Sequence, residues 1–74
     1  MSISQLKARA VCATGNLPEM LALADSVAHS SAASGEQIAL SKATIRSIRA
    51  ELSHPSKTKR EVALIRYAKL VSNL

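Results

Sequence analysis

The sequence predicts a small all-α protein, a compact bundle of about four short helices in a single domain over residues 1–74. Three observations support this fold class. No run of residues alternates β-branched and polar side chains, so signals for strands are missing. Residues that begin and end helices recur along the chain instead. The 74 residues include 18 Leu, Ile and Val but only one aromatic residue, Tyr67, so they form one domain with a small core.

The first helix is expected over residues 3–13. Ser2 and Gln5 have the spacing of a capping box, in which each side chain binds the backbone of the other residue. Gly15 allows the left-handed turn that commonly ends a helix.

A second helix is expected over residues 17–30. Asn16 is its N-cap, Pro18 lies in its first turn and Glu19 occupies its third position. Its apolar residues fall within one arc at about 100° per residue, which is typical of a half-buried helix.

A third helix is expected over residues 35–53. Ser34 and Gln37 repeat the capping-box spacing, and His54-Pro55 ends the helix because the residue before a proline avoids helical backbone angles. Isoleucines at helical spacing form a narrow apolar stripe, and a basic stripe runs beside it. This basic stripe consists of Lys42, Arg46 and Arg49.

The last helix is expected over residues 57–73, with Thr58 and Glu61 at capping-box spacing. Val62 and Ile65 lie outside its main apolar arc and would be exposed in an isolated helix bundle. Either the first helix packs on them, or a dimer or partner contact covers them. The predicted partner or dimer interface consists of Val62, Ile65, Arg66 and Lys69.

The net charge of +5 is distributed unevenly. Residues 54–74 carry +4, whereas residues 15–34 carry −2. This asymmetry suits an anionic partner, either duplex DNA or an acidic protein surface, although excess charge also keeps small proteins in solution. The members of the basic stripe are spaced i, i+4, i+7 and point the same way, with alanines nearby. The stripe is therefore either a face that enters a major groove or an ordinary solvated face.

The segment TIRSIRAELSHPS resembles the stretch of lambda-repressor/Cro-like helix-turn-helix domains that runs from the recognition helix to the next helix. It shares with them a Thr-Ile pair at 44–45, an Ile at 48 and a Pro-Ser pair at 55–56. Weaker similarity on both sides extends the resemblance over residues 34–74. It implies DNA binding through the third helix, to which we add the basic residues that open the last helix. The predicted nucleic-acid-binding set is Ser41, Lys42, Thr44, Arg46, Arg49, Lys57, Lys59 and Arg60.

The segment departs from that family in one respect. About four residues are missing from the turn that sets the second helix and the recognition helix at roughly 90–120° to each other. Residues 35–53 are therefore expected either as one continuous helix or as two.

Several function classes find no support in the sequence. Cys12 has no second cysteine to pair with, no apolar run approaches the roughly 18 residues of a membrane span, and no signal peptide is recognisable. Motifs for metal binding, phosphate loops or catalysis do not occur. We therefore expect a cytoplasmic protein of bacterial, phage or plasmid type that is not an enzyme and has no cofactor, no metal site and no small-molecule substrate.

Taken together, these features favour a small basic DNA-binding regulator that contacts duplex DNA through its third helix. We expect a homo-oligomer, since pairing through the last helix would add both stability and a second half-site. The alternative is a small helical protein of phage or plasmid type that binds a host protein complex and inhibits or adapts it. A structural subunit of a larger assembly is the third hypothesis.

Overall fold

The computed structural model describes residues 2–74, which contain four α-helices: α1 (Ile3–Ala13), α2 (Leu17–Ala28), α3 (Gly35–Ser53) and α4 (Lys57–Ser72). The predicted all-helical bundle is confirmed, and α2 and α4 end one or two residues earlier than expected. α3 is one continuous helix, which decides between the two alternatives for this segment. No helix within the described part of the chain is long and apolar enough to cross a membrane.

The first three helices begin at the predicted residues. Ser2 Oγ accepts a hydrogen bond from Gln5 N at 3.3 Å, Ser34 Oγ accepts one from Gln37 N at 3.2 Å, and both capping boxes are complete. Asn16 caps α2 through its side-chain oxygen. These caps satisfy backbone N–H groups that the first turn of a helix leaves without partners.

α4 begins at Lys57 as predicted, but its N-terminal cap differs from the prediction. The capping box expected at Thr58 does not form, because Ser56 is the N-cap and its Oγ accepts a hydrogen bond from Lys59 N at 3.1 Å. The N–H of Ser56 in turn donates to Glu51 Oε2 at 3.1 Å. A buried carboxylate of α3 thus replaces the local Glu of a capping box and ties the start of α4 to the end of α3.

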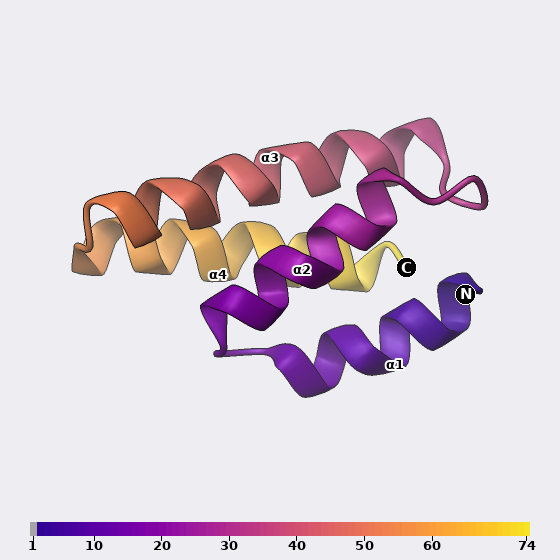
Figure 1. The fold of residues 1–74 in the computed structure, drawn as a ribbon, viewed down its shortest axis with the longest axis horizontal. Coiled ribbons are helices and arrows are strands. Elements are labelled where there is room, and N and C mark those ends of the chain that lie inside the picture. Colours follow the sequence, from indigo (N-terminus) through magenta and orange to yellow (C-terminus); the bar gives the residue numbers. More distant parts are fainter. Residues whose placement is uncertain (1) are drawn as a thin grey trace.

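α3 and α4 form an antiparallel hairpin, and α2 crosses it (Figure 1). α1 contacts α2 and, to a smaller extent, α4. The closed end of the hairpin projects beyond α2, and every residue from Leu52 to Val62 is exposed. We call this segment the hairpin tip. It is held by contacts between α3 and α4 and presents both of its helix ends to solvent.

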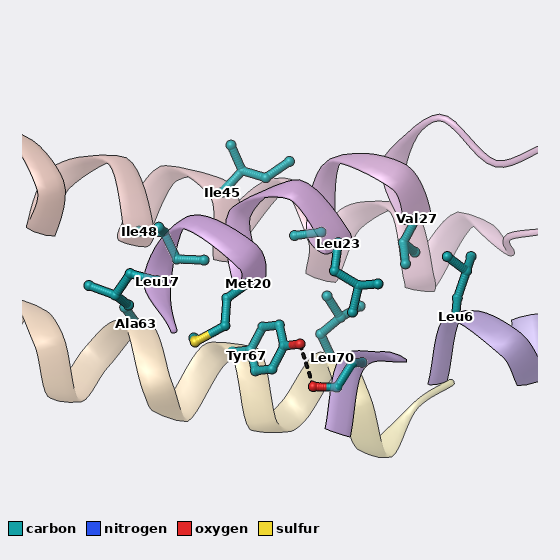
Figure 2. Close-up of a cluster of buried hydrophobic side chains, with 12 residues drawn as sticks. Leu6, Leu17, Met20, Leu23, Val27, Ile45, Ile48, Ala63, Tyr67 and Leu70 are labelled. Atoms are coloured by element: carbon teal, nitrogen blue, oxygen red, sulfur yellow. Dashed lines mark hydrogen bonds between the residues drawn. The ribbon is translucent and has the colours of Figure 1, made fainter. Parts of the chain in front are cut away.

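All four helices contribute to a core around Met20, Ile48 and Tyr67 (Figure 2). Tyr67, only 1% exposed, is the largest buried side chain, and its hydroxyl donates a hydrogen bond to the carbonyl of Ala10 at 2.6 Å. Small residues such as Ala10 and Ala63 are fully buried and allow the helices to pack closely. The low aromatic content is thus offset by one aromatic ring in the centre and by alanines at the contacts.

The Tyr67→Phe substitution is expected to lower the free energy of unfolding by about 1 to 2 kcal/mol, because it leaves the buried carbonyl of Ala10 with a weaker set of partners. Urea denaturation followed by circular dichroism measures this loss. An unchanged midpoint would show that the hydroxyl contributes nothing to the attachment of α1.

The pH dependence of the same variant provides a second readout. Burial raises the pKa of Tyr67 from 10.0 to about 12. The folded protein therefore keeps this proton at pH values where the unfolded chain loses it, so wild-type stability should fall as the pH rises from 10 toward 12. The Tyr67→Phe variant lacks this group, and the stability difference between the two proteins should shrink over that interval.

Candidate nucleic-acid interface

The basic stripe lies on the exposed edge of α3. Lys42, Arg46 and Arg49 are all exposed, and they span about 10 Å along the helix axis at 1.5 Å per residue. Ala39 and Ala50, also exposed, adjoin the stripe and add little bulk. The opposite side of α3 is buried against α2 and α4, so the stripe is the part of this helix that an incoming partner would meet.

The α3–α4 hairpin carries the whole net charge of the protein. Residues 35–74 contain eight of the ten Lys and Arg residues and three of the five Asp and Glu residues, a net charge of +5. Residues 1–34 contain two of each and are neutral. The charge asymmetry noted in the sequence is therefore an asymmetry between two packed halves of the fold.

The basic side chains of the hairpin form no ion pairs within residues 2–74. At the end of α2, outside the hairpin, His29 Nδ1 lies 3.6 Å from Asp25 Oδ1. Glu51 is buried beside the hairpin tip. Its carboxylate accepts a hydrogen bond from the N–H of Ser56 and does not pair with a basic side chain. The positive charges of α3 and α4 are thus not neutralised internally and remain available to an anionic partner.

The predicted residues at the start of α4 are also exposed. Lys57, Lys59 and Arg60 all lie in the hairpin tip, within one and a half turns of the Ser56 cap. Arg49 lies one turn before the end of α3, so the basic stripe runs up to the same tip. The structure brings these two predicted groups to one end of the hairpin.

The prediction was wrong for Ser41 and Thr44, which are fully buried. Ser41 Oγ donates to the carbonyl of Gln37 at 2.7 Å. Thr44 Oγ1 donates to the carbonyl of Leu40 at 2.8 Å and lies 3.2 Å from the carbonyl of Arg66 on α4. Because short hydroxyl side chains can bond to the carbonyl four residues earlier, they enter a helix interface without an unsatisfied group.

Helical spacing by itself indicates that Ser41 and Thr44 are buried. Ser41 lies four residues before Ile45, and Thr44 lies four residues before Ile48, so each shares a face with a buried isoleucine. The resemblance to the repressor family placed them on the outside. Their alignment with the apolar stripe of α3 indicates that they are buried, and in the structure both are.

The continuous course of α3 also bears on the shape of a DNA contact. Residues 35–53 contain no turn, so the segment that is similar to the second helix and the recognition helix of the repressor family forms a single helix. The angle that a helix-turn-helix requires between these two helices is therefore not formed within α3. Any contact through the basic stripe uses the side of one helix.

The predicted partner interface on α4 is exposed. Val62 is 38% exposed and Ile65 is 68% exposed, and the neighbouring Arg66 and Lys69 are exposed as well. α1 does not cover them, because it packs near the opposite side of α4, where the hydroxyl of Tyr67 reaches it. Packing of α1 on this apolar spot, one of the two alternatives, is therefore wrong, and a dimer or partner contact stays a prediction.

Features that would indicate a reaction centre are weak in the described part of the chain. Residues 2–74 contain no cluster of three or more His, Cys, Asp or Glu side chains that could hold a metal ion. An open groove of about 510 Å³ lies between α1 and α2, where exposed Cys12 and Arg9 meet Glu19 and Ala22. Within residues 2–74, the thiol of Cys12 forms no hydrogen bond with the carboxylate of Glu19.

No family model, no curated protein and no solved structure matches the chain. What the protein does must therefore be inferred from its own residues, their exposure and their charge.

The burial of Thr44 leads to a direct test. Thr44→Val keeps the shape of the side chain but removes the hydroxyl from the α3–α4 interface, so we expect a loss of about 1 kcal/mol in the free energy of unfolding. Arg46→Ala, two residues along on the exposed edge, should change that free energy by less than about 0.5 kcal/mol. Chemical denaturation of both variants makes the comparison. Equal effects would contradict the inward orientation of Thr44.

Proposed function

We propose that this protein is a small DNA-binding regulator that binds the phosphate backbone of duplex DNA through the basic edge of its α3–α4 hairpin. One observation carries the proposal. Lys42, Arg46 and Arg49 form a row of exposed basic side chains, and none of them makes an ion pair within residues 2–74. This row continues into the basic hairpin tip. A concentration of unpaired positive charge along one edge is the usual electrostatic footprint of a nucleic-acid-binding protein.

The dimensions of α3 suit a groove of DNA. A helix with its side chains is about 10–12 Å across, close to the roughly 12 Å width of the major groove of B-form DNA. The exposed Ala39 and Ala50 allow the backbone of α3 to approach the duplex, while the longer basic side chains reach the phosphates on either side. Lys57, Lys59 and Arg60 extend the positive surface from α3 to the tip.

Such a contact would be dominated by phosphates. Ser41 and Thr44 are buried and make no contact with bases in this fold, which leaves Arg46 and Arg49 as the residues of α3 best able to bond guanine edges. We therefore expect moderate sequence preference and strong salt dependence. A regulator of this kind acts by occupying DNA and excluding other proteins from it.

Reversing two charges tests the proposal. The double variant Arg46→Glu, Arg49→Glu should lose measurable affinity for a short duplex at about 50 mM salt, while its helical circular dichroism spectrum stays unchanged. Fluorescence anisotropy of a labelled duplex measures the affinity. In Arg49→Ala, the slope of log K against log salt concentration should become shallower by about one.

The matched control compares single reversals of equal charge. Arg46→Glu on α3 and Lys7→Glu on α1 both lower the net charge from +5 by two, but Lys7 lies on the neutral half of the fold. We expect a large loss of affinity in the first variant and a small one in the second. Equal losses, or no duplex binding by the wild-type protein at low salt, would rule the proposal out.

A second candidate function is a protein-binding module whose basic edge docks on an acidic surface of a host protein complex and inhibits or adapts it. The continuous course of α3 favours this candidate, since a base-reading helix-turn-helix is not formed. The same unpaired charges would then face carboxylates in place of phosphates.

The two candidates differ in their response to nuclease. If the protein binds DNA, tagged wild-type protein should lose its co-purifying material when a cell lysate is treated with nuclease. If it is a protein-binding module, a stoichiometric protein partner should remain, and the Arg46→Glu variant should release that partner. Quantitative mass spectrometry of the captured material distinguishes the two outcomes.

A further inference from the structure

The side of α4 that faces away from the core has the spacing of a helix-pairing surface. Ala63, Tyr67 and Leu70 point into the core, and the residues on the opposite side recur at intervals of four and three. All of them are exposed, and we call them the outer face of α4. The outer face consists of Thr58, Val62, Ile65, Lys69 and Ser72, with Glu61 and Ala68 alongside.

Steps of three and four are those by which two helices pack along a shared seam. Here the most apolar member, Ile65, lies in the middle and is 68% exposed. The end positions, Thr58 and Ser72, are small and polar and lie at equal distances from Ile65 along the helix. Residues at equal distances before and after Ile65 are therefore compatible in size, and a surface that pairs with itself about a two-fold axis needs such self-complementarity.

We propose that a second copy of this chain covers the outer face, with the two α4 helices packed antiparallel about a two-fold axis at Ile65. In this arrangement each residue faces the one that lies equally far from Ile65 on the other side. Ile65 meets Ile65 of the second copy, and Val62 meets Ala68 of the second copy. The exposed apolar atoms of Ile65 and Val62 are thus covered by Ile65 and Ala68 of the second copy.

The charges on the outer face favour a second copy of the chain as its partner and an antiparallel direction for the two α4 helices. Glu61 precedes Ile65 by four residues and Lys69 follows it by four, so the two-fold axis places Glu61 against Lys69 of the second copy, twice. A parallel pair in register would oppose Glu61 to Glu61 and Lys69 to Lys69, which is unfavourable. A foreign partner would need no such symmetry between the two sides of Ile65.

The expected dimer is weak. α4 has 16 residues and is about 24 Å long, and a contact between two such helices buries less than the roughly 1,200 Å² of a typical stable interface. We therefore expect dissociation in the micromolar range or above. The basic stripe lies on α3 and contributes no residue to this contact, whereas the outer face shares Thr58, Glu61 and Val62 with the hairpin tip.

A charge swap tests the pairing. Sedimentation equilibrium on the purified chain, up to about 1 mM, should show a monomer–dimer equilibrium for the wild type. Glu61→Lys and Lys69→Glu should each weaken the dimer by about tenfold, because each creates two like-charge contacts, and the double variant should restore it. All of these positions are exposed, and circular dichroism confirms that the variants fold.

Cross-linking tests the position of the axis. In a Cys12→Ser background, Ile65→Cys should form a disulfide-linked dimer on mild oxidation, because the axis brings this residue against its own copy. The matched control, Ser72→Cys, lies seven residues away and should not cross-link faster than random collision. A wild-type monomer at every concentration, failure of the double variant to restore association, or equal cross-linking at both positions would overturn the proposal.

Discussion

The hydrogen bond from the hydroxyl of Tyr67 to the carbonyl of Ala10 is the contact on which the closure of the bundle depends. It joins α4 to α1 across 57 residues of sequence. The carbonyl of Ala10 is among the last four of α1, which the helix itself cannot satisfy. The ring fills the centre of a core that has no other aromatic residue. One side chain therefore both fills the centre of the core and links the N-terminal helix to α4.

The small residues of this chain also contribute to the packing of the helix bundle. Buried alanines bring the helices close, and at that separation Ser41 and Thr44 fit between them by bonding to carbonyl groups. The interior thus combines Leu, Ile, Met and Val side chains with buried alanines and with hydroxyl groups that bond to carbonyls of their own helix. Ser41 and Thr44 are residue types that can contact DNA, but their positions on α3 place them in its buried interface.

Burial of one side of each hairpin helix separates two surfaces with different characters. α3 turns its isoleucines inward and presents Lys42, Arg46 and Arg49, whereas α4 turns Tyr67 inward and presents Ile65 among small and charged residues. The first surface suits a polyanion and the second suits another helix. In the two proposals, the exposed sides of one hairpin serve two different contacts, and neither contact uses core residues.

Helix positions follow from the sequence alone, because caps such as Ser2, Asn16 and Ser34 act within one turn of the residues they satisfy. Exposure of the basic stripe follows as well, since helical spacing sets it against the apolar side. Contacts between helices are different. The hydrogen bond from Ser56 N to Glu51, the burial of Thr44 against α4, and the exposure of Ile65 all depend on which helix packs where. Local patterns determine where helices begin and which side is apolar, and only tertiary packing decides which apolar side is left uncovered.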